Sequence, residues 1–480
     1  MVTGNGTPIT LTHPGNALGA FGAVNPASVK GNGLVDVLDG SGALDLLGSN
    51  VGFRLYVRAA GAVTQSGPIS AERLTLQGTG RDPITLDTQP NKIDRFTALN
   101  TTADGTSSAP VSIRDAAGDL ILNYIDGSAL SVVAAGPVTQ VPSGYIKGTS
   151  LAVTGNGSPI TLDQAPNTVA AFQATNPGGT VTFKDASAGL VLGTSLAGFM
   201  NLTAVGPVSQ SGPIVADRFS LLGSGFDPVV LDTQDNDFGR FTVANSTADV
   251  SVKDAAGDLE IGYIDGGKVA VSVAGGLTEL FYIAASKLSV TGTGAGPIVL
   301  DSTTNKVGTF TAANGIGDIT FVDGDGGLVI GGLEGTALSI QAVGDITQTG
   351  AILGDSLAVT STTGGVALPL ETNGIASITG GATKDFVFTN FPGFDAGPIT
   401  VTGAKSNIVL KSVTGSIDVV GTLTAGNLVS LVAPLGTFTL VPPAEIVAKV
   451  LSYDTATPPS FNPADVPDII AVNGNLTINK

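Results

Sequence analysis

The sequence contains no cysteine, no tryptophan and a single histidine, His13. Without cysteine the chain has no disulfide, no thiol nucleophile and no thiolate metal ligand. One histidine leaves almost no imidazole for acid–base chemistry or metal binding. We therefore expect no cofactor. The absence of cysteine is also compatible with a bacterial surface protein.

Positive charge is scarce as well. Lysine and arginine number 21 against 39 aspartate and glutamate residues, for a net charge of −18, and the sequence shows no basic cluster. Affinity for a nucleic-acid backbone comes from many lysine and arginine contacts, so no nucleic-acid partner is expected. Disorder is not expected either, because hydrophobic residues make up 42% of the chain and charged residues only 12%.

Long uninterrupted apolar runs are missing. The charge-free stretch 186–216 alternates apolar with small or polar residues and is broken by glycine and proline, whereas a spanning helix needs about 20 mainly apolar residues. We predict no transmembrane segment. Residues 2–12 read as a strand and not as a signal peptide, which leaves two alternatives: the signal has been removed, or Met1 begins a fragment.

Valine, leucine, isoleucine and threonine dominate instead, together with 67 glycines and 26 prolines. This mixture favours strands separated by many turns. A Pro-(Ile/Val)-(Thr/Val)-Leu segment recurs at Pro8, Pro83, Pro159, Pro228 and Pro297, and so defines five imperfect repeats of about 70 residues.

Each repeat then carries two asparagines nine residues apart with a phenylalanine between them. The first Asn series is Asn16, Asn91, Asn167, Asn236 and Asn305; the second Asn series is Asn25, Asn100, Asn176, Asn245 and Asn314; the Phe series is Phe21, Phe96, Phe172, Phe241 and Phe310. We predict that these residues are structural and form ladders of stacked side chains, in which asparagine amides satisfy one another.

Two further positions recur at nearly constant spacing. The turn-Asp series is Asp39, Asp115, Asp185, Asp254 and Asp323, and 25 or 26 residues after each comes the Gln series, Gln65, Gln140, Gln210, Glu279 and Gln348. The repeats differ in length mainly between the second asparagine and the turn aspartate. Insertion at one corner is typical of stacked coils, because loops project outward while paired strands keep their register.

Short strands with apolar residues two apart recur every nine or ten residues, as at 310–312 and 319–321. The sequence therefore predicts an all-β fold, a β-solenoid (right-handed parallel β-helix) of about five repeats with a divergent C-terminal section. Three coils of roughly 23 residues per repeat would give about 20 coils. Tandem immunoglobulin-like sandwiches are the alternative architecture.

The expected boundaries follow the repeats. They are 1–77, 78–153, 154–222, 223–290 and 291–359 for repeats 1 to 5, 360–433 for degenerate solenoid coils, and 434–480 for a proline-rich cap or junction with a terminal strand. Because both ends follow the repeat pattern, the chain is either a piece of a longer solenoid or a subunit that stacks end to end.

The segments Gly206–Ile214 and Leu151–Asp163, with the strand that runs between the paired asparagines, resemble the repeats of filamentous-haemagglutinin-like proteins and autotransporter passengers. The resemblance covers most of residues 1–433. It implies a right-handed β-helix, secretion to the cell surface and a role in adhesion or cell contact. The family's amino-terminal secretion domain and carboxy-terminal membrane barrel are missing here, which leaves the export route open.

We therefore expect an extracellular or cell-surface protein that is structural or adhesive, with copies of itself and surface or carbohydrate ligands as partners. The alternative function is a carbohydrate-active β-helix enzyme, a polysaccharide lyase or hydrolase. No catalytic residue is expected, because the carboxylates recur in every repeat. Asp323 and Asp325 weakly resemble a calcium loop but lack its distal glutamate, so a solvated turn is the preferred interpretation.

Overall fold

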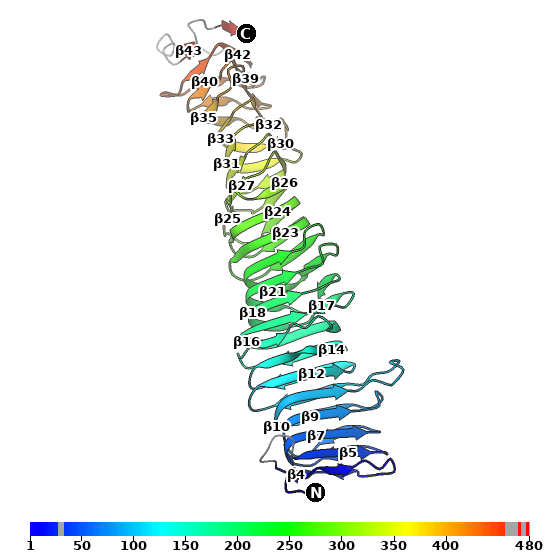
Figure 1. Cartoon of the computed structure of the whole chain (residues 1–480). Coiled ribbons are helices and arrows are strands. Elements are labelled where there is room, and N and C mark those ends of the chain that lie inside the picture. The colour runs from blue at the N-terminus through cyan, green and yellow to red at the C-terminus, as the bar shows by residue number, and fades with distance from the viewer. Residues whose placement is uncertain (27–32, 457–468, 472–476, 480) are drawn as a thin grey trace. The chain divides into compact units, whose positions relative to one another are not determined.

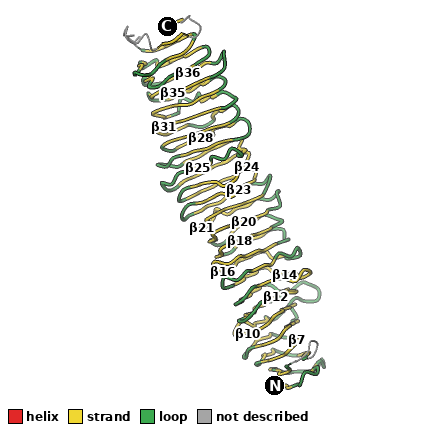
Figure 2. The backbone as a smooth tube through the Cα atoms, turned by 60° about the vertical axis from the view of Figure 1, so that its left-hand side comes forward, coloured by secondary structure: helices red, strands yellow, loops and turns green. Residues whose placement is uncertain are grey.

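The computed structural model describes residues 1–26, 33–456, 469–471 and 477–479. All regular secondary structure in these residues is β-strand, and none of it is helix (Figure 2). The strands wind as successive coils, about 21 turns of about 21 residues each (Figure 1). The predicted β-solenoid is confirmed. The structural repeat is the single coil, and about three coils make up one 70-residue sequence repeat.

Strands pair in parallel with strands one coil earlier and one coil later. In β7 (Ser49–Ala59), for example, Leu55 is in register with Val35 of β5 (Leu34–Asp39) and with Leu74 of β9 (Ile69–Gln77). Immunoglobulin-like sandwiches are built of antiparallel sheets, so parallel pairing excludes that alternative. The antiparallel bridge in the described residues, Thr101 to Ser108, lies in a loop.

The chain comprises two compact units, Met1–Phe238 and Gly239–Lys480, and their division falls inside β21 (Val229–Ala244). Besides β5, β7 and β9, the described strands of the first unit are β1 (Val2–Thr3), β2 (Ile9–Leu11), β3 (Ala20–Phe21), β4 (Ala23–Asn25), β6 (Leu44–Leu46), β8 (Val63–Gln65), β10 (Ile84–Leu99), β11 (Val111–Asp115), β12 (Leu120–Asp126), β13 (Ala129–Ala134), β14 (Val138–Thr154), β15 (Ile160–Leu162), β16 (Thr168–Lys184), β17 (Leu190–Leu192), β18 (Ser195–Thr203), β19 (Val208–Gln210) and β20 (Ile214–Leu222).

The second unit continues the same strand pattern along the chain. Its described strands after β21 are β22 (Val250–Asp254), β23 (Leu259–Val273), β24 (Leu277–Gly292), β25 (Ile298–Leu300), β26 (Lys306–Ala313), β27 (Ile319–Asp323), β28 (Leu328–Glu334), β29 (Ala337–Ala342), β30 (Ile346–Gln348), β31 (Ile352–Ser361), β32 (Val366–Leu368), β33 (Gly374–Ala382), β34 (Phe386–Asn390), β35 (Phe394–Val401), β36 (Asn407–Ser412), β37 (Ile417–Val419), β38 (Leu423–Thr424), β39 (Leu428–Ala433), β40 (Phe438–Leu440), β41 (Ile446–Ala448), β42 (Val450–Thr455), β43 (Ile469–Ala471) and β44 (Thr477–Asn479).

Alternation of apolar and polar residues builds the core, since successive side chains in a strand point to opposite faces. In β9 the buried residues are Ile69, Ala71, Leu74 and Leu76. All five members of the Phe series are buried as well. Phe172 stacks on Phe183 with 4.2 Å between ring centroids, and Phe310 stacks on Phe321 with 4.0 Å.

The section after residue 359, expected as degenerate coils, keeps parallel pairing. Val429 of β39, for example, is in register with Ile408 of β36 and Leu451 of β42. Of the predicted cap at 434–480, residues 457–468, 472–476 and 480 lie outside the described residues. Its described strands β40, β41 and β42 pair in parallel with β37, β38 and β39. No helix in the described part of the chain is long and apolar enough to cross a membrane.

Candidate functional site

The first Asn series meets the Gln series inside the coils. Gln65 and Asn91 are both buried and exchange two hydrogen bonds: Gln65 Nε2 donates to Asn91 Oδ1 at 2.8 Å, and Asn91 Nδ2 donates to Gln65 Oε1 at 3.1 Å. The main-chain N–H of Ile69 also donates to Asn91 Oδ1, and Asn91 Nδ2 reaches the carbonyls of Leu86 and Arg114. The pair satisfies its own buried polar atoms and those of two coils.

The same amide pair recurs along the chain. Reciprocal pairs with donor–acceptor distances of 2.7–3.2 Å join Gln140 to Asn167, Gln210 to Asn236, and Gln348 to Asn373. At the fourth position a carboxylate replaces the amide, and Glu279 Oε1 accepts from Asn305 Nδ2 at 2.8 Å. Asn16, in the first repeat, instead donates to the carbonyls of Leu11 and Leu38.

Each aspartate of the turn-Asp series lies one coil after an asparagine of the first Asn series. Asp115 is in register with Asn91 and accepts the main-chain N–H of Ile93 at 2.8 Å through Oδ1. Its other oxygen, Oδ2, is buried and has no hydrogen-bond partner among the described residues. Burial raises the pKa of Asp115 to about 6, and burial has the same effect at Asp323. These aspartates are interior residues and not members of a solvated turn.

The sequence pattern did not reveal a sixth set of these buried polar residues, which consists of Gln348, Asn373 and Asn390. Asn373 pairs with Gln348, and Asn390 takes the place of the turn aspartate: its Oδ1 accepts the N–H of Ile375 and its Nδ2 donates to the carbonyls of Ile375 and Pro392. The available signal was spacing, because Asn373 follows Gln348 by 25 residues while Asn91 follows Gln65 by 26.

The second Asn series is buried at another corner, beneath Gly-x-Gly turns of the preceding coil. Asn100 Oδ1 accepts the N–H of Gly80, and a Cβ added to Gly78 would lie 2.2 Å from that oxygen. Corresponding close approaches are found between Gly4 and Asn25, Gly155 and Asn176, and Gly292 and Asn314. The first glycine of each string therefore makes room for an asparagine.

The structure does not stack the asparagines of the first series on one another, as the predicted ladder of like side chains would require. A first-series asparagine contacts a glutamine, a glutamate or main chain, and the next asparagine of its series belongs to the next sequence repeat, about three coils away. The physical reason is complementarity, because a glutamine side chain one coil away supplies both a donor and an acceptor to the asparagine amide.

The weak calcium candidate does not form a cluster. Asp323 is buried, and its Oδ1 accepts the N–H of Val307, whereas Asp325 Oδ2 lies 3.5 Å from Lys306 Nζ. Among the described residues no group of three or more histidine, aspartate or glutamate side chains could hold a metal ion.

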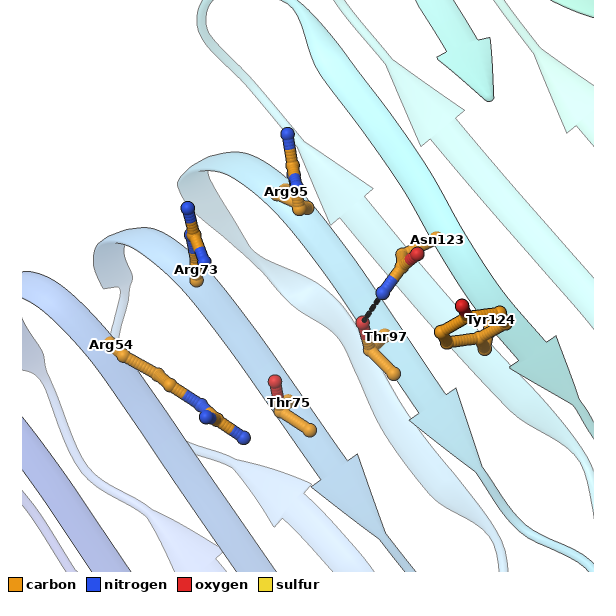
Figure 3. A pocket seen from close by; sticks show the side chains of 7 residues that line it. All are labelled: Arg54, Arg73, Thr75, Arg95, Thr97, Asn123 and Tyr124. Atoms are coloured by element: carbon orange, nitrogen blue, oxygen red, sulfur yellow. Dashed lines mark hydrogen bonds between the residues drawn. The ribbon is translucent and has the colours of Figure 1, made fainter. Parts of the chain in front are cut away.

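A basic cluster that the sequence did not reveal lies on the outside of the first unit. Arg54 of β7, Arg73 of β9 and Arg95 of β10 are in register on three successive coils. They line a hollow of about 270 Å³, drawn in Figure 3, together with Thr75, Thr97, Asn123 and Tyr124. Their spacings of 19 and 22 residues match one coil each. We call Arg54, Arg73 and Arg95 the arginine column.

The chain matches a described family in part. Residues 32–100, 108–176 and 178–245 match repeats of unknown function (DUF5649), together less than half of the chain. Each matched segment ends at a member of the second Asn series: Asn100, Asn176 or Asn245. No curated protein and no solved structure matches the chain. The findings support a β-helix repeat protein and name no adhesin or autotransporter family.

Proposed function

We propose that this protein is a structural or adhesive rod that acts outside the cell, as a surface fibre or a segment of an adhesin. The observation that carries the proposal is the buried amide pair, which is found with nearly the same geometry at four places, the first Gln65–Asn91 and the last Gln348–Asn373. Buried polar residues that recur in every repeat hold coils in register. The outward side chains differ from coil to coil and are free to contact partners.

Adhesion outside the cell is also consistent with the composition. The chain has no cysteine to oxidise and a net charge of −18, which keeps a repetitive β-protein soluble. Polyclonal antibody against the purified chain should label intact cells of the source organism. Labelling only after lysis would refute the extracellular part of the proposal.

The rod itself is tested by imaging the purified chain. Negative-stain electron microscopy should show elongated particles if the protein acts as a rod, because the coils within each unit stack at the strand spacing of about 4.8 Å. End-to-end association would lengthen the particles with protein concentration. Particles as wide as they are long would contradict the proposal.

One observation favours the alternative, a carbohydrate-active enzyme. The hollow lined by Asn50, Ser70, Glu72, Lys92 and Asp94 places two carboxylates on coils that also carry Arg73 and Arg95. Acidic and basic side chains in a cleft are typical of glycan-cleaving sites. Incubation of the chain with acidic polysaccharides should reveal shortened products if this function is correct, and Glu72→Gln with Asp94→Asn should abolish them.

A further inference from the structure

The arginine column is unusual in this chain. Six of the eight arginines lie between residues 54 and 114, although the protein carries 18 excess negative charges. Within that segment, register brings three of them onto one outward face, on coils separated by the strand spacing of about 4.8 Å. In Figure 3 the side chains of Arg73 and Arg95 run nearly parallel, and Arg54 extends along its strand.

Little in the described structure neutralises the column. No carboxylate among the described residues lies within 4.0 Å of the charged nitrogens of Arg54 or Arg95, and Arg73 has a half-exposed contact of 3.7 Å with Glu72. By contrast Arg58, four residues from Arg54, pairs with Asp36 at 2.8 Å. Like charges opposite one another on neighbouring strands are destabilising, so the free column costs stability that a bound anion would recover.

Aromatic rings hold two of the guanidinium groups on the surface. The Arg54 guanidinium carbon lies 4.8 Å from the centroid of the Tyr56 ring, and that of Arg73 lies 5.1 Å from the centroid of the Phe53 ring. Cation–π contact of this kind orders an arginine and leaves its N–H groups free to donate. An ordered guanidinium is suited to two-pronged binding of a carboxylate or sulfate.

The rest of the hollow offers hydroxyl and amide groups. Asn123 Nδ2 donates to Thr97 Oγ1 at 3.2 Å, which leaves the Asn123 side-chain carbonyl to accept from a ligand. Thr75 lies between Arg54 and Thr97 in Figure 3. Such groups match the hydroxyls of a sugar, and the step from coil to coil is comparable with the length of one sugar unit in a linear chain.

We propose that the arginine column binds a linear acidic polysaccharide that runs across successive coils, with its carboxylate or sulfate groups on Arg54, Arg73 and Arg95. The proposal rests on the adhesive function proposed above and names its ligand class. A nucleic acid fits less well, because single strands need exposed aromatic faces for base stacking. The one tyrosine of the hollow, Tyr124, packs against Tyr145 with 5.3 Å between ring centroids.

Binding of the full chain to polygalacturonate, dextran sulfate, neutral dextran and oligodeoxythymidylate tests the proposal, by isothermal titration calorimetry at two salt concentrations. We expect binding to polygalacturonate, dextran sulfate or both, weakened by salt, and none to neutral dextran. The carboxylate and sulfate probes identify which group is recognised. Binding to neither, or tighter binding to oligodeoxythymidylate, would overturn the proposal.

A charge-matched pair of variants locates the site. Arg54→Gln/Arg73→Gln/Arg95→Gln should lower the affinity at least tenfold, since hydrogen bonds to charged groups are the strong ones. Arg81→Gln/Arg114→Gln/Arg218→Gln removes the same three charges from exposed positions of the first unit outside the column and should change affinity less than twofold. Equal losses in both variants would show that only net charge matters and would overturn the assignment.

Thermal unfolding shows whether the variants fold and adds a second measurement. The polysaccharide should raise the melting temperature of the wild type and leave that of the column variant unchanged. The outcomes also separate the two proposals. Elongated, surface-labelled protein that binds no polysaccharide refutes this inference alone, whereas binding by a chain that antibody does not label on intact cells refutes the extracellular function and leaves the site.

Discussion

Gln65 and Asn91 lie 26 residues apart in the sequence and exchange two hydrogen bonds in the interior of the first unit. The pair links two successive coils through side chains as well as main chain. A one-residue slip of either coil would turn these amides toward the opposite face of the strand. The pair therefore specifies register in a repetitive sequence that offers many alternative pairings.

The first prediction concerns this pair. Asn91→Ala removes the acceptor of Ile69 N–H and leaves the Gln65 amide buried without its partner, at about 1–3 kcal/mol for each unsatisfied group. We expect a loss of about 3 kcal/mol in local stability, measured by hydrogen exchange in β8 to β10. Asn50→Ala, at an exposed position of β7, is the control and should change exchange little. Equal effects of the two substitutions would contradict the structural role.

Glu279 provides the second prediction. It takes the glutamine position of the amide pair, its Oε2 is buried without a hydrogen-bond partner among the described residues, and burial raises its pKa. Glu279→Gln supplies a donor for Asn305 Oδ1, as Gln65 does for Asn91. We expect the variant to unfold at higher urea concentration than the wild type at pH 7, by about 1 kcal/mol or more. The reverse change, Gln210→Glu, should destabilise at the same pH.

The third prediction is a pH dependence. Because the folded pKa of about 6 at Asp115 and Asp323 exceeds the value of 3.8 for a free side chain, the folded state binds more protons than the unfolded state between pH 4 and 6. Stability should therefore fall as pH rises through this window, by about 2 kcal/mol per group. Urea unfolding at pH 4.5 and pH 7 measures the difference.

A substitution already present in the chain indicates how to remove that dependence. Asn390 occupies the turn-Asp position of the sixth set, and its Nδ2 donates to two carbonyls. Asp115→Asn should likewise stabilise the protein at pH 7 and flatten its pH profile. Asp119→Asn, at an exposed position in the same turn, should do neither. A profile that keeps its slope in Asp115→Asn would exclude Asp115 as its source.

The fourth prediction concerns the glycine above Asn100. A Cβ at residue 78 would lie 2.2 Å from Asn100 Oδ1, so Gly78→Ala should cost about 1–3 kcal/mol. In the background of Asn100→Ala the same change should cost much less, because the clashing atom is gone. Gly48→Ala, where the nearest atom is 3.8 Å from the new Cβ, is the control. Additive losses in the double variant would show that the clash is not the cause.

The class of fold could be predicted from the sequence, but the coil length could not be read directly. The asparagine, phenylalanine and glutamine positions all return at the 70-residue period, whereas the coil of about 21 residues carries no single residue type at a fixed place. Glycines and alternating apolar residues determine turns and strands locally, so these elements can be predicted directly from the sequence. The length of a coil, in contrast, depends on how its strands pair with those of the neighbouring coils.

The arginine column could not be predicted from the sequence. Residues 54, 73 and 95 are separated by 19 and 22 residues, and the pairing of β7 with β9 shifts register between Val51 and Arg54. No fixed period predicts that these three side chains share a face. The sequence therefore shows no basic cluster, whereas the structure brings these three arginines together.

The sequence by itself determined that the chain forms strands that stack in parallel around an aliphatic interior, because the alternation of apolar and polar residues and the turn residues act over a few positions. Only the tertiary structure decided which side chains meet: Gln65 with Asn91, Gly78 with Asn100, and Arg54 with Arg73 and Arg95. Those contacts depend on the register between coils, which coil length and bulges set together over about 20 residues at a time.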